Sequence, residues 1–313
     1  MKRLKLLAPL LCCAILPAGC APLSAPAQYG VAVSRVAEIR DAFLTPSDDV
    51  MIVAHRGCWK HAAENAVSAI HACRRLGIEI VELDVRRTRD GVLVLMHDDM
   101  VDRTTDGTGP AEAMTLAEFK RLRLRAGAGG PDAPLTDEAP PTLAEAIEAA
   151  RGALLVNIDA KGPVVLDAVR TLDEQGLLDH AIIKTTAPPT DPVLQRMIHA
   201  GTILYMPVLD ERRLDRPLSD EMRRFHGSSP AAYEIVFQTQ EYLEEAMPGI
   251  QAQGRRLWVN TLRRDHAAGH TDARAMLDPD AHWGALARWG ATIIQTDEPE
   301  ALAAWLREKD LRR

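Results

Sequence analysis

Residues 80–85 read Ile-Val-Glu-Leu-Asp-Val, an apolar run that carries two carboxylates two positions apart. Side chains of a strand alternate between its faces, so Glu82 and Asp84 share one face and the apolar side chains share the other. Two unpaired carboxylates on one face repel each other and are costly to bury. The run therefore predicts a strand whose acidic pair holds a divalent cation. A half-exposed strand with a polar face is the alternative.

Similar short apolar runs recur along the chain, and stretches with helical periodicity separate most of them. Strands that alternate with helices over this length predict a (β/α)8 barrel of the TIM type, with a doubly wound open sheet as the structural alternative. The predicted parallel strands are 50–55, 79–86, 154–159, 181–185, 203–208, 233–238, 256–261 and 292–296. The predicted helices are Glu64–Leu76, Leu143–Ala150, Pro163–Glu174, Asp191–His199, Glu241–Ala252 and Trp283–Trp289.

Two segments depart from this alternation. The Asp90-Gly91 pair is a hairpin turn signal and predicts that Val92–Met96 pairs antiparallel with the preceding strand. Residues 101–141 are rich in glycine and proline, and we interpret them as an insertion on the barrel rim, helical around Thr115–Leu124. The remaining pattern predicts a single barrel domain over residues 50–313.

The first twenty residues have the pattern of an export signal. Three basic residues precede an apolar run from Leu6 to Leu16, which is short for a membrane span. The small residues before Cys20 resemble a bacterial lipobox, which predicts a lipidated Cys20 that tethers the protein to a membrane. Cleavage after Ala27 is the alternative. Both interpretations predict an exported protein, periplasmic or membrane-anchored, in which residues 21–49 form a spacer and lead-in.

Composition excludes some classes of protein. With 47% apolar and 26% charged residues the chain is an ordinary globular one. Removal of residues 1–19 deletes three basic residues and no acidic one, which changes the formal net charge from −7 to −10. No basic patch stands out in the sequence, so we expect no nucleic-acid partner.

Two cysteines lie beyond Cys20, at positions 58 and 73. An oxidising compartment permits a bridge between them. Cys73, however, falls on the apolar stripe of the helix predicted from Glu64. We therefore predict that it is a buried free thiol.

The carboxyl ends of the predicted strands carry chemically capable side chains. In a (β/α)8 barrel the active site lies at this end of the strands. Side chains gathered there by packing alone would not be expected to include so many acids, bases and cations. The residues are His55, Glu82, Asp84, His97, Asp159, Lys161 and Lys184.

Several short motifs together resemble the glycerophosphodiester phosphodiesterase family. The resemblance runs from about Met51 to Leu306 and is most specific before Gly109. The motifs are His55-Arg56-Gly57, Glu64-Asn65, Glu82-x-Asp84, Asp90-Gly91, His97-Asp98, Arg103-Thr104-Thr105-x-Gly107-x-Gly109, Pro141-Thr142-Leu143 and Thr296-Asp297-x-Pro299.

The resemblance implies a TIM-type barrel, one divalent cation and hydrolysis of glycerophosphodiesters to glycerol 3-phosphate and an alcohol. It also implies that Glu82 and Asp84 are metal ligands and that Asp159 is the third. Members of the family usually have glutamate at the third position, and because aspartate is shorter the ion would sit deeper here, take a water or be held less tightly. Ala63 and Ala66 also depart from the family pattern. These two differences bear on the geometry of the loop and on the range of substrates more than on the class of reaction.

Elementary chemistry agrees with these implied roles. Oxygen ligands favour Mg²⁺ or Ca²⁺. Arg56 and Lys161 are suited to bind the remaining phosphate oxygens. His55 and His97 can exchange protons near neutral pH, and we expect His97 to be the general acid and His55 the general base, with the reverse assignment open.

Other candidates keep two interpretations. Glu64 either caps the first helix or contacts the metal. Trp258 and Asn260 share a strand face and could contact the alcohol, although Trp258 could equally be core. Lys184 is a weaker phosphate candidate, and Arg103 is expected to order the rim loop. Histidines without a motif are taken as surface or structural: His61, His71, His180, His226, His266, His270 and His282.

The leading hypothesis is an exported, metal-dependent phosphodiesterase whose small-molecule substrates are deacylated phospholipid head groups. One alternative is phospholipase D-like cleavage of lysolipids through a cyclic phosphate. A second is a lipoprotein that binds phosphodiesters without turnover. The sequence leaves the preferred alcohol and the oligomeric state open.

Overall fold

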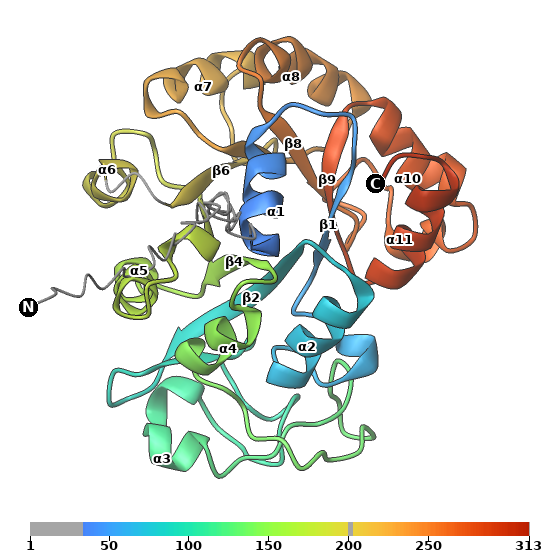
Figure 1. Ribbon diagram of the computed structural model, residues 1–313. Coiled ribbons are helices and arrows are strands. Elements are labelled where there is room, and N and C mark those ends of the chain that lie inside the picture. Colours follow the sequence, from blue (N-terminus) through green and yellow to red (C-terminus); the bar gives the residue numbers. More distant parts are fainter. Residues whose placement is uncertain (1–33, 200–202, 313) are drawn as a thin grey trace, which may run out of the picture. The chain divides into compact units, whose positions relative to one another are not determined.

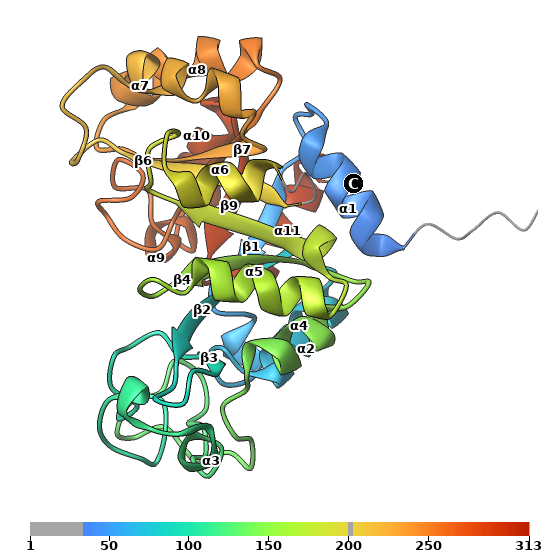
Figure 2. The same ribbon diagram turned by 90° about the vertical axis from the view of Figure 1, so that its left-hand side faces the viewer.

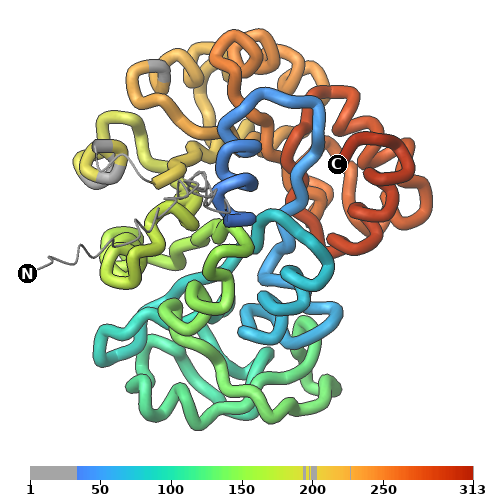
Figure 3. Tube along the Cα trace, viewed as in Figure 1, coloured from blue at the N-terminus to red at the C-terminus, as the bar shows by residue number. Residues whose placement is uncertain are grey.

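Eight parallel strands close into a ring in the computed structural model, which describes residues 34–199 and 203–312. The ring runs β1, β9, β8, β7, β6, β5, β4, β2, and β1 also pairs with β2, so the ring itself has no open edge. Figure 3 shows the first and last strands side by side where the ring closes. The (β/α)8 prediction is confirmed and the open sheet is excluded. The strands are β1 (Met51–Ala54), β2 (Ile80–Arg87), β3 (Leu93–Leu95), β4 (Leu155–Ala160), β5 (Ala181–Thr185), β6 (Leu204–Asp210), β7 (Ala232–Val236), β8 (Arg256–Asn260) and β9 (Ala291–Thr296).

Helices surround the ring and cover its outer face (Figure 1). Along most strands the side chains that point outward join the large core beneath these helices, while the alternate side chains fill the barrel. The helices are α1 (Arg35–Leu44), α2 (Val67–Leu76), α3 (Leu116–Phe119), α4 (Leu143–Ala150), α5 (Val165–Glu174), α6 (Pro192–His199), α7 (Leu218–Arg224), α8 (Gln240–Ala252), α9 (Asp272–Ala275), α10 (Pro279–Arg288) and α11 (Pro299–Glu308).

Helix α1 closes the end of the barrel where the strands begin (Figure 2). Its apolar side chains Val36, Ile39 and Phe43 are buried and belong to the same cluster as the inward side chains of the strands. The helix lies within residues 21–49, for which the sequence pattern gave no secondary structure. With this end covered, access to the barrel interior is left to the opposite end, where the strands finish.

Helix α2 begins at Val67, three residues later than the sequence pattern predicted. Asn65 has a left-handed backbone with φ of 57°, which a helix interior does not allow. Its side chain donates to Asp84 Oδ2 at 2.8 Å and accepts from the Asp84 N–H at 3.0 Å. The residues before α2 are thus held by the neighbouring strand, and this tertiary contact overrides helix propensity.

Other helix boundaries also shift. Helix α10 begins at Pro279, before the predicted start at Trp283, because Asp278 caps it through the N–H of Ala281 and a proline fits the first turn. Among the described residues the pattern did not predict α1 at the end of the barrel, nor α7, α9 and α11 around it.

Strand β3 pairs antiparallel with β2 outside the ring, as the Asp90-Gly91 turn predicts. Residues 101–141 then form a lobe whose small core around Phe119 is shared with Val94 and Met96 at β3. The predicted helix at Thr115–Leu124 is wrong in length, since α3 covers only Leu116–Phe119. The chain leaves the helix because the N–H of Leu124 bonds to Glu138 O at 2.8 Å and so joins another segment of the lobe.

Cys58 and Cys73 form a disulfide, so the prediction of a free thiol is wrong. Both side chains are buried, as the apolar stripe indicated. The bridge joins the loop after β1 to the second turn of α2. Sequence periodicity placed Cys73 on the correct helix face but did not show that the preceding loop folds back against that face.

The predictions on the export signal and on Cys20 lie outside the described residues. Within the described part of the chain, none of the helices combines the length and the apolar character that crossing a membrane requires.

Candidate active site

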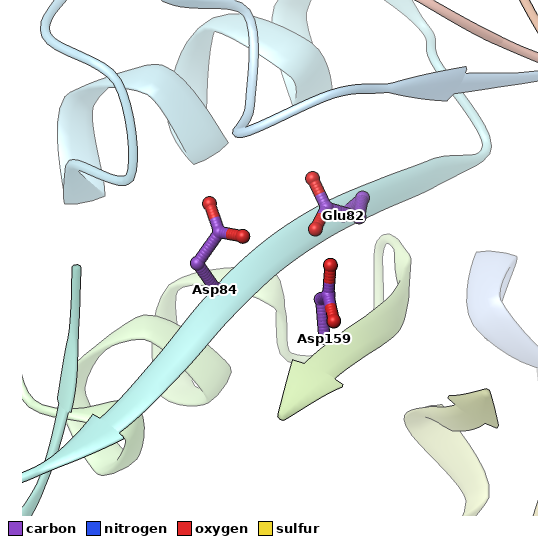
Figure 4. A group of neighbouring side chains, drawn as sticks. All are labelled: Glu82, Asp84 and Asp159. Carbon is purple, nitrogen blue, oxygen red and sulfur yellow. The ribbon is translucent and has the colours of Figure 1, made fainter. Parts of the chain in front are cut away.

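Three carboxylates converge at the carboxyl end of the barrel (Figure 4). Glu82 and Asp84 come from β2 and Asp159 comes from β4, and the β2–β4 register places Asp84 directly opposite Asp159. One oxygen from each residue lies within 4.8 Å of the others. Glu82 and Asp84 are fully buried, whereas Asp159 is partly exposed. The acidic group is therefore open to solvent on one side only.

Burying three acids together has an electrostatic cost that the site offsets incompletely. Burial, reinforced by the charge of Asp84, raises the pKa of Glu82 to about 7. Glu82 Oε2 accepts the N–H of Arg56 at 2.9 Å, but Glu82 Oε1 has no hydrogen-bond partner within the described ranges. An unsatisfied buried carboxylate oxygen aimed at two other carboxylates is a suitable ligand for a cation.

Two lysines contact the aspartates of the acidic group. Lys161 Nζ lies 2.9 Å from Asp84 Oδ1 and 2.8 Å from Asp159 Oδ2, and Lys184 Nζ lies 3.2 Å from Asp159 Oδ2. Burial opposes ionisation of Asp159, but Lys184 and Lys161 hold its pKa at about 2. Burial likewise opposes ionisation of Asp84, and Lys161 more than offsets it and lowers that pKa. All ligand atoms of the acidic group are carboxylate oxygens, and Asp84 and Asp159 are ionised. This set of ligands fits a hard divalent cation.

His55 follows β1 and lies next to the residue that follows β9. Its Nδ1 is 2.8 Å from Asp297 Oδ1, which also accepts Trp59 Nε1–H at 2.9 Å. Burial opposes protonation of His55, but the bond to Asp297 and the charge of Glu82 raise its pKa. With Nδ1 donating to Asp297, the lone pair of His55 Nε2 is free for proton transfer.

His97 occupies the corresponding place beside Asp84. The N–H of Met96 bonds to Asp84 O at 3.1 Å, which positions the end of β3 against β2. His97 Nδ1 lies 2.6 Å from Asp98 Oδ1, and Arg103 Nε donates to Asp98 Oδ2 at 2.6 Å. Each imidazole is thus oriented by its own carboxylate, and the rings act electrostatically on different members of the acidic group, His55 on Glu82 and His97 on Asp84.

Arg56 and Glu64 form an ion-pair network at the rim. Arg56 Nη1 lies 3.2 Å from Glu64 and its Nε lies 3.6 Å from Asp84 Oδ2. Both oxygens of Glu64 also accept from Arg103 at 2.8 Å. Glu64 precedes the N-cap of α2, which is Ala66, so it bonds to the two arginines and not to the end of the helix. Arg103 links this network to the residue-128 loop of the lobe.

Residues 55–301 match the model of the glycerophosphoryl diester phosphodiesterase family. The chain belongs to this family. The mouse protein named glycerophosphodiester phosphodiesterase 1 is 42% identical over 120 residues, which are 38% of this chain and 36% of that protein. The glycerophosphodiester phosphodiesterase of Caldanaerobacter subterraneus is 41% identical over 117 residues, 37% of this chain and 47% of that protein. The matched region is therefore less than half of either relative.

Solved structures of the glycerophosphoryl diester phosphodiesterase family share the fold. One from Parabacteroides distasonis has a TM-score of 0.70 at 21% identity and covers 88% of this chain and 93% of that one. A phosphodiesterase from Oleispira antarctica, solved with the product sn-glycerol-3-phosphate, has a TM-score of 0.61 at 23% identity, with 86% and 99% covered. At these identities the likeness concerns the barrel itself.

In this family member Trp258 and Asn260 belong to the barrel interior. Trp258 is fully buried in the cluster that includes α1, and its Nε1 donates to Asn260 Oδ1 at 2.9 Å. Asn260 Nδ2 in turn donates to Glu234 Oε1 at 2.7 Å. The structure thus follows the core interpretation of Trp258. Lys184 is half-buried beside Asp159, and the charges of Glu234 and Asp159 raise its pKa against the effect of burial.

Sequence reasoning assigned no role to several residues that support the site. Asp297, Asp98 and Asn65 each orient a residue of the acidic group or its histidines, and all three belong to motifs that carried the family resemblance. Their places in those motifs could have identified them as residues of the site. Glu234 had no motif, and its electrostatic effect on Lys184 follows from the pairing of β5 and β7 with β6.

Proposed function

We propose that this protein hydrolyses glycerophosphodiesters to sn-glycerol 3-phosphate and an alcohol with the help of one divalent cation, Mg²⁺ or Ca²⁺. The observation that carries the proposal is the convergence of Glu82, Asp84 and Asp159 between two carboxylate-bound histidines. The names of the relatives give this same class of reaction. The solved structure of the Oleispira antarctica phosphodiesterase contains the product sn-glycerol-3-phosphate.

Glu82, Asp84 and Asp159 would hold the cation. When bound, it polarises a phosphoryl oxygen and offsets the negative charge that develops in the transition state. Mg²⁺ and Ca²⁺ are favoured over softer transition-metal ions because every ligand is an oxygen. The unsatisfied Oε1 of Glu82 supports this assignment, since a cation would satisfy it and would lower the pKa that burial raises.

The protein's own side chains would bind the phosphodiester and move two protons. Arg56 and Lys161 lie at the rim of the acidic group and bind the remaining phosphate oxygens. His55 Nε2 accepts a proton from water as the water oxygen bonds to phosphorus. His97 donates a proton to the alcohol oxygen as its bond to phosphorus breaks. Asp297 and Asp98 keep each imidazole in the orientation that this transfer requires.

The test combines product analysis with metal removal. Purified protein should release sn-glycerol 3-phosphate from glycerophosphocholine, as followed by ³¹P NMR, should lose this activity with chelator and should regain it with Mg²⁺ or Ca²⁺. Glu82→Gln keeps the size of the side chain and should abolish turnover. Glu174→Gln, on the exposed end of α5, is the matched control and should leave turnover unchanged. Tight binding without turnover under every metal condition would indicate a binding protein instead, and a cyclic phosphate from lysolipid would indicate the phospholipase D-like reaction.

We also propose that the protein is exported and that a lipid on Cys20 tethers it to a membrane. The Cys58–Cys73 disulfide supports export, because such bonds persist in oxidising compartments. Mass spectrometry of the mature N-terminus tests the tether. A chain that starts at Cys20 with two or three acyl groups would support it, and an unmodified N-terminus after Ala27 would refute it.

A further inference from the structure

Two histidines without a motif face each other away from the acidic group. His270 lies in the connection between β8 and α10, and His282 lies in the first turn of α10. Their Nδ1 atoms are 3.0 Å apart, with ring centroids 5.1 Å apart and planes inclined at 61°. Both side chains are half-buried, so solvent and small ions can reach them.

We propose that His270 and His282 form a second metal site, which takes a transition ion such as Ni²⁺, Cu²⁺ or Zn²⁺ between their Nδ1 atoms. Two nitrogens bound at about 2.05 Å to one ion lie roughly 2.9 Å apart at a right angle and roughly 3.4 Å apart at a tetrahedral angle. The observed 3.0 Å lies between these two values, so one transition ion can reach both nitrogens. Water completes the coordination.

The surroundings keep both rings in the form that binds metal. Burial lowers the pKa of His270 and of His282. The charges of His282, Arg274 and Arg288 lower that of His270 further, and the charge of Arg274 lowers that of His282. The rings are therefore neutral at pH 7 and their lone pairs are available. The positive charge of Arg274 opposes a cation, but its Nη1 donates to Gly269 O at 2.9 Å and so points at the backbone. The charge of Asp278 near His282 acts in the favourable direction.

The two sites select different ions. The acidic group offers carboxylate oxygens and suits Mg²⁺ or Ca²⁺, whereas the histidine pair offers nitrogens and suits softer ions. A bound ion would join the β8–α10 connection to α10. That connection also carries Asp272, which accepts the N–H of Asp297 at 2.8 Å.

Trp289 provides a direct optical test. Its ring centroid lies 4.9 Å from that of His270, so a paramagnetic ion held by the pair should quench its emission. The experiment titrates Ni²⁺ into the full chain in the presence of excess Mg²⁺, which occupies the acidic group. The readout is tryptophan emission, which is independent of enzyme activity. Trp289→Phe removes the responding fluorophore and should remove most of the saturable change.

The expected result is saturable quenching at one Ni²⁺ per chain, which Zn²⁺ reverses by competition. His270→Gln and His282→Gln should each raise the midpoint at least tenfold, and His71→Gln, on the exposed face of α2, should leave it unchanged. Thermal unfolding without metal checks that each variant is folded. A midpoint that His282→Gln does not move, or quenching that never saturates, would overturn the proposal and leave the two rings joined by an N–H···N bond alone.

Discussion

Replacing Asp297 by asparagine tests whether the carboxylate behind His55 acts through its charge. Asp297 Oδ1 accepts both His55 Nδ1–H and Trp59 Nε1–H, at 2.8 and 2.9 Å. The amide oxygen of asparagine can take the place of Oδ1 and accept both bonds. The backbone N–H of residue 297 still donates to Asp272. Asp297→Asn therefore keeps the geometry and removes one negative charge.

The expected loss follows from the strength of the bond. A hydrogen bond to a charged group contributes about 1.5–3 kcal/mol, and that contribution is largest when His55 becomes positively charged during proton transfer. At 1.4 kcal/mol per tenfold change in rate, kcat/KM should fall roughly 10- to 150-fold. The pKa of His55 should also fall, because the bond to Asp297 contributes to raising it. As a neutral base is required, the acid limb of the pH profile should move to lower pH.

The assay measures kcat/KM for glycerophosphocholine from pH 5 to pH 9 at saturating Mg²⁺. Glu298→Gln is the matched control, because this neighbouring carboxylate pairs with Lys60 and not with His55. Thermal unfolding establishes that both variants are folded. Full activity of Asp297→Asn with an unshifted acid limb would refute the reasoning, because it would show that the charge of Asp297 does not act on His55.

Three further predictions concern stability and need no assumption about activity. Replacing Cys58 and Cys73 together by alanine should lower the free energy of urea unfolding by about 3 kcal/mol, because the bridge closes a 15-residue separation in the unfolded chain; a change below about 1 kcal/mol would contradict this. Gly57→Ala should cost about 2 kcal/mol or more, because its φ is +80° and a Cβ there would lie 2.8 Å from an alanine Cβ on α2. Gly91→Ala, at φ of +90° with nothing within 4 Å, controls for the backbone term and should cost less in the same urea titration. Burial lowers the pKa of His266 to about 4 in the folded protein. The unfolded chain, in which the pKa is near 6.5, therefore binds the proton more readily. As the pH falls from about 6.5 to 4, the free energy of unfolding should decrease. Urea unfolding at pH 4.5, 5.5 and 6.5 should show a smaller pH dependence for His266→Gln than for the natural chain, and equal slopes would contradict the assignment.

The sequence by itself determined the barrel and most of the acidic group. The alternation of side chains between the two faces of a strand is a local property. It predicted that Glu82 and Asp84 lie on the same face without any knowledge of the fold. The alternation of strands and helices then predicted a barrel, whose active end follows from strand direction. Strand ends also placed Asp159 at this end of the barrel, whereas its role as third ligand came only from the family resemblance. The β2–β4 register then shows Asp159 opposite Asp84.

Only the tertiary structure decided which distant groups become partners. Ring closure brings β1 beside β9, and so places His55 against Asp297, 242 residues later in the chain. Pairing of β5 and β7 with β6 brings Glu234 close enough to Lys184 to raise its pKa. Folding of the loop after β1 onto α2 joins Cys58 to Cys73, against the expectation from periodicity. Local patterns specify the face on which a side chain lies. The partner on that face depends on the packing of the whole chain, because contacts between remote segments form only when the barrel closes.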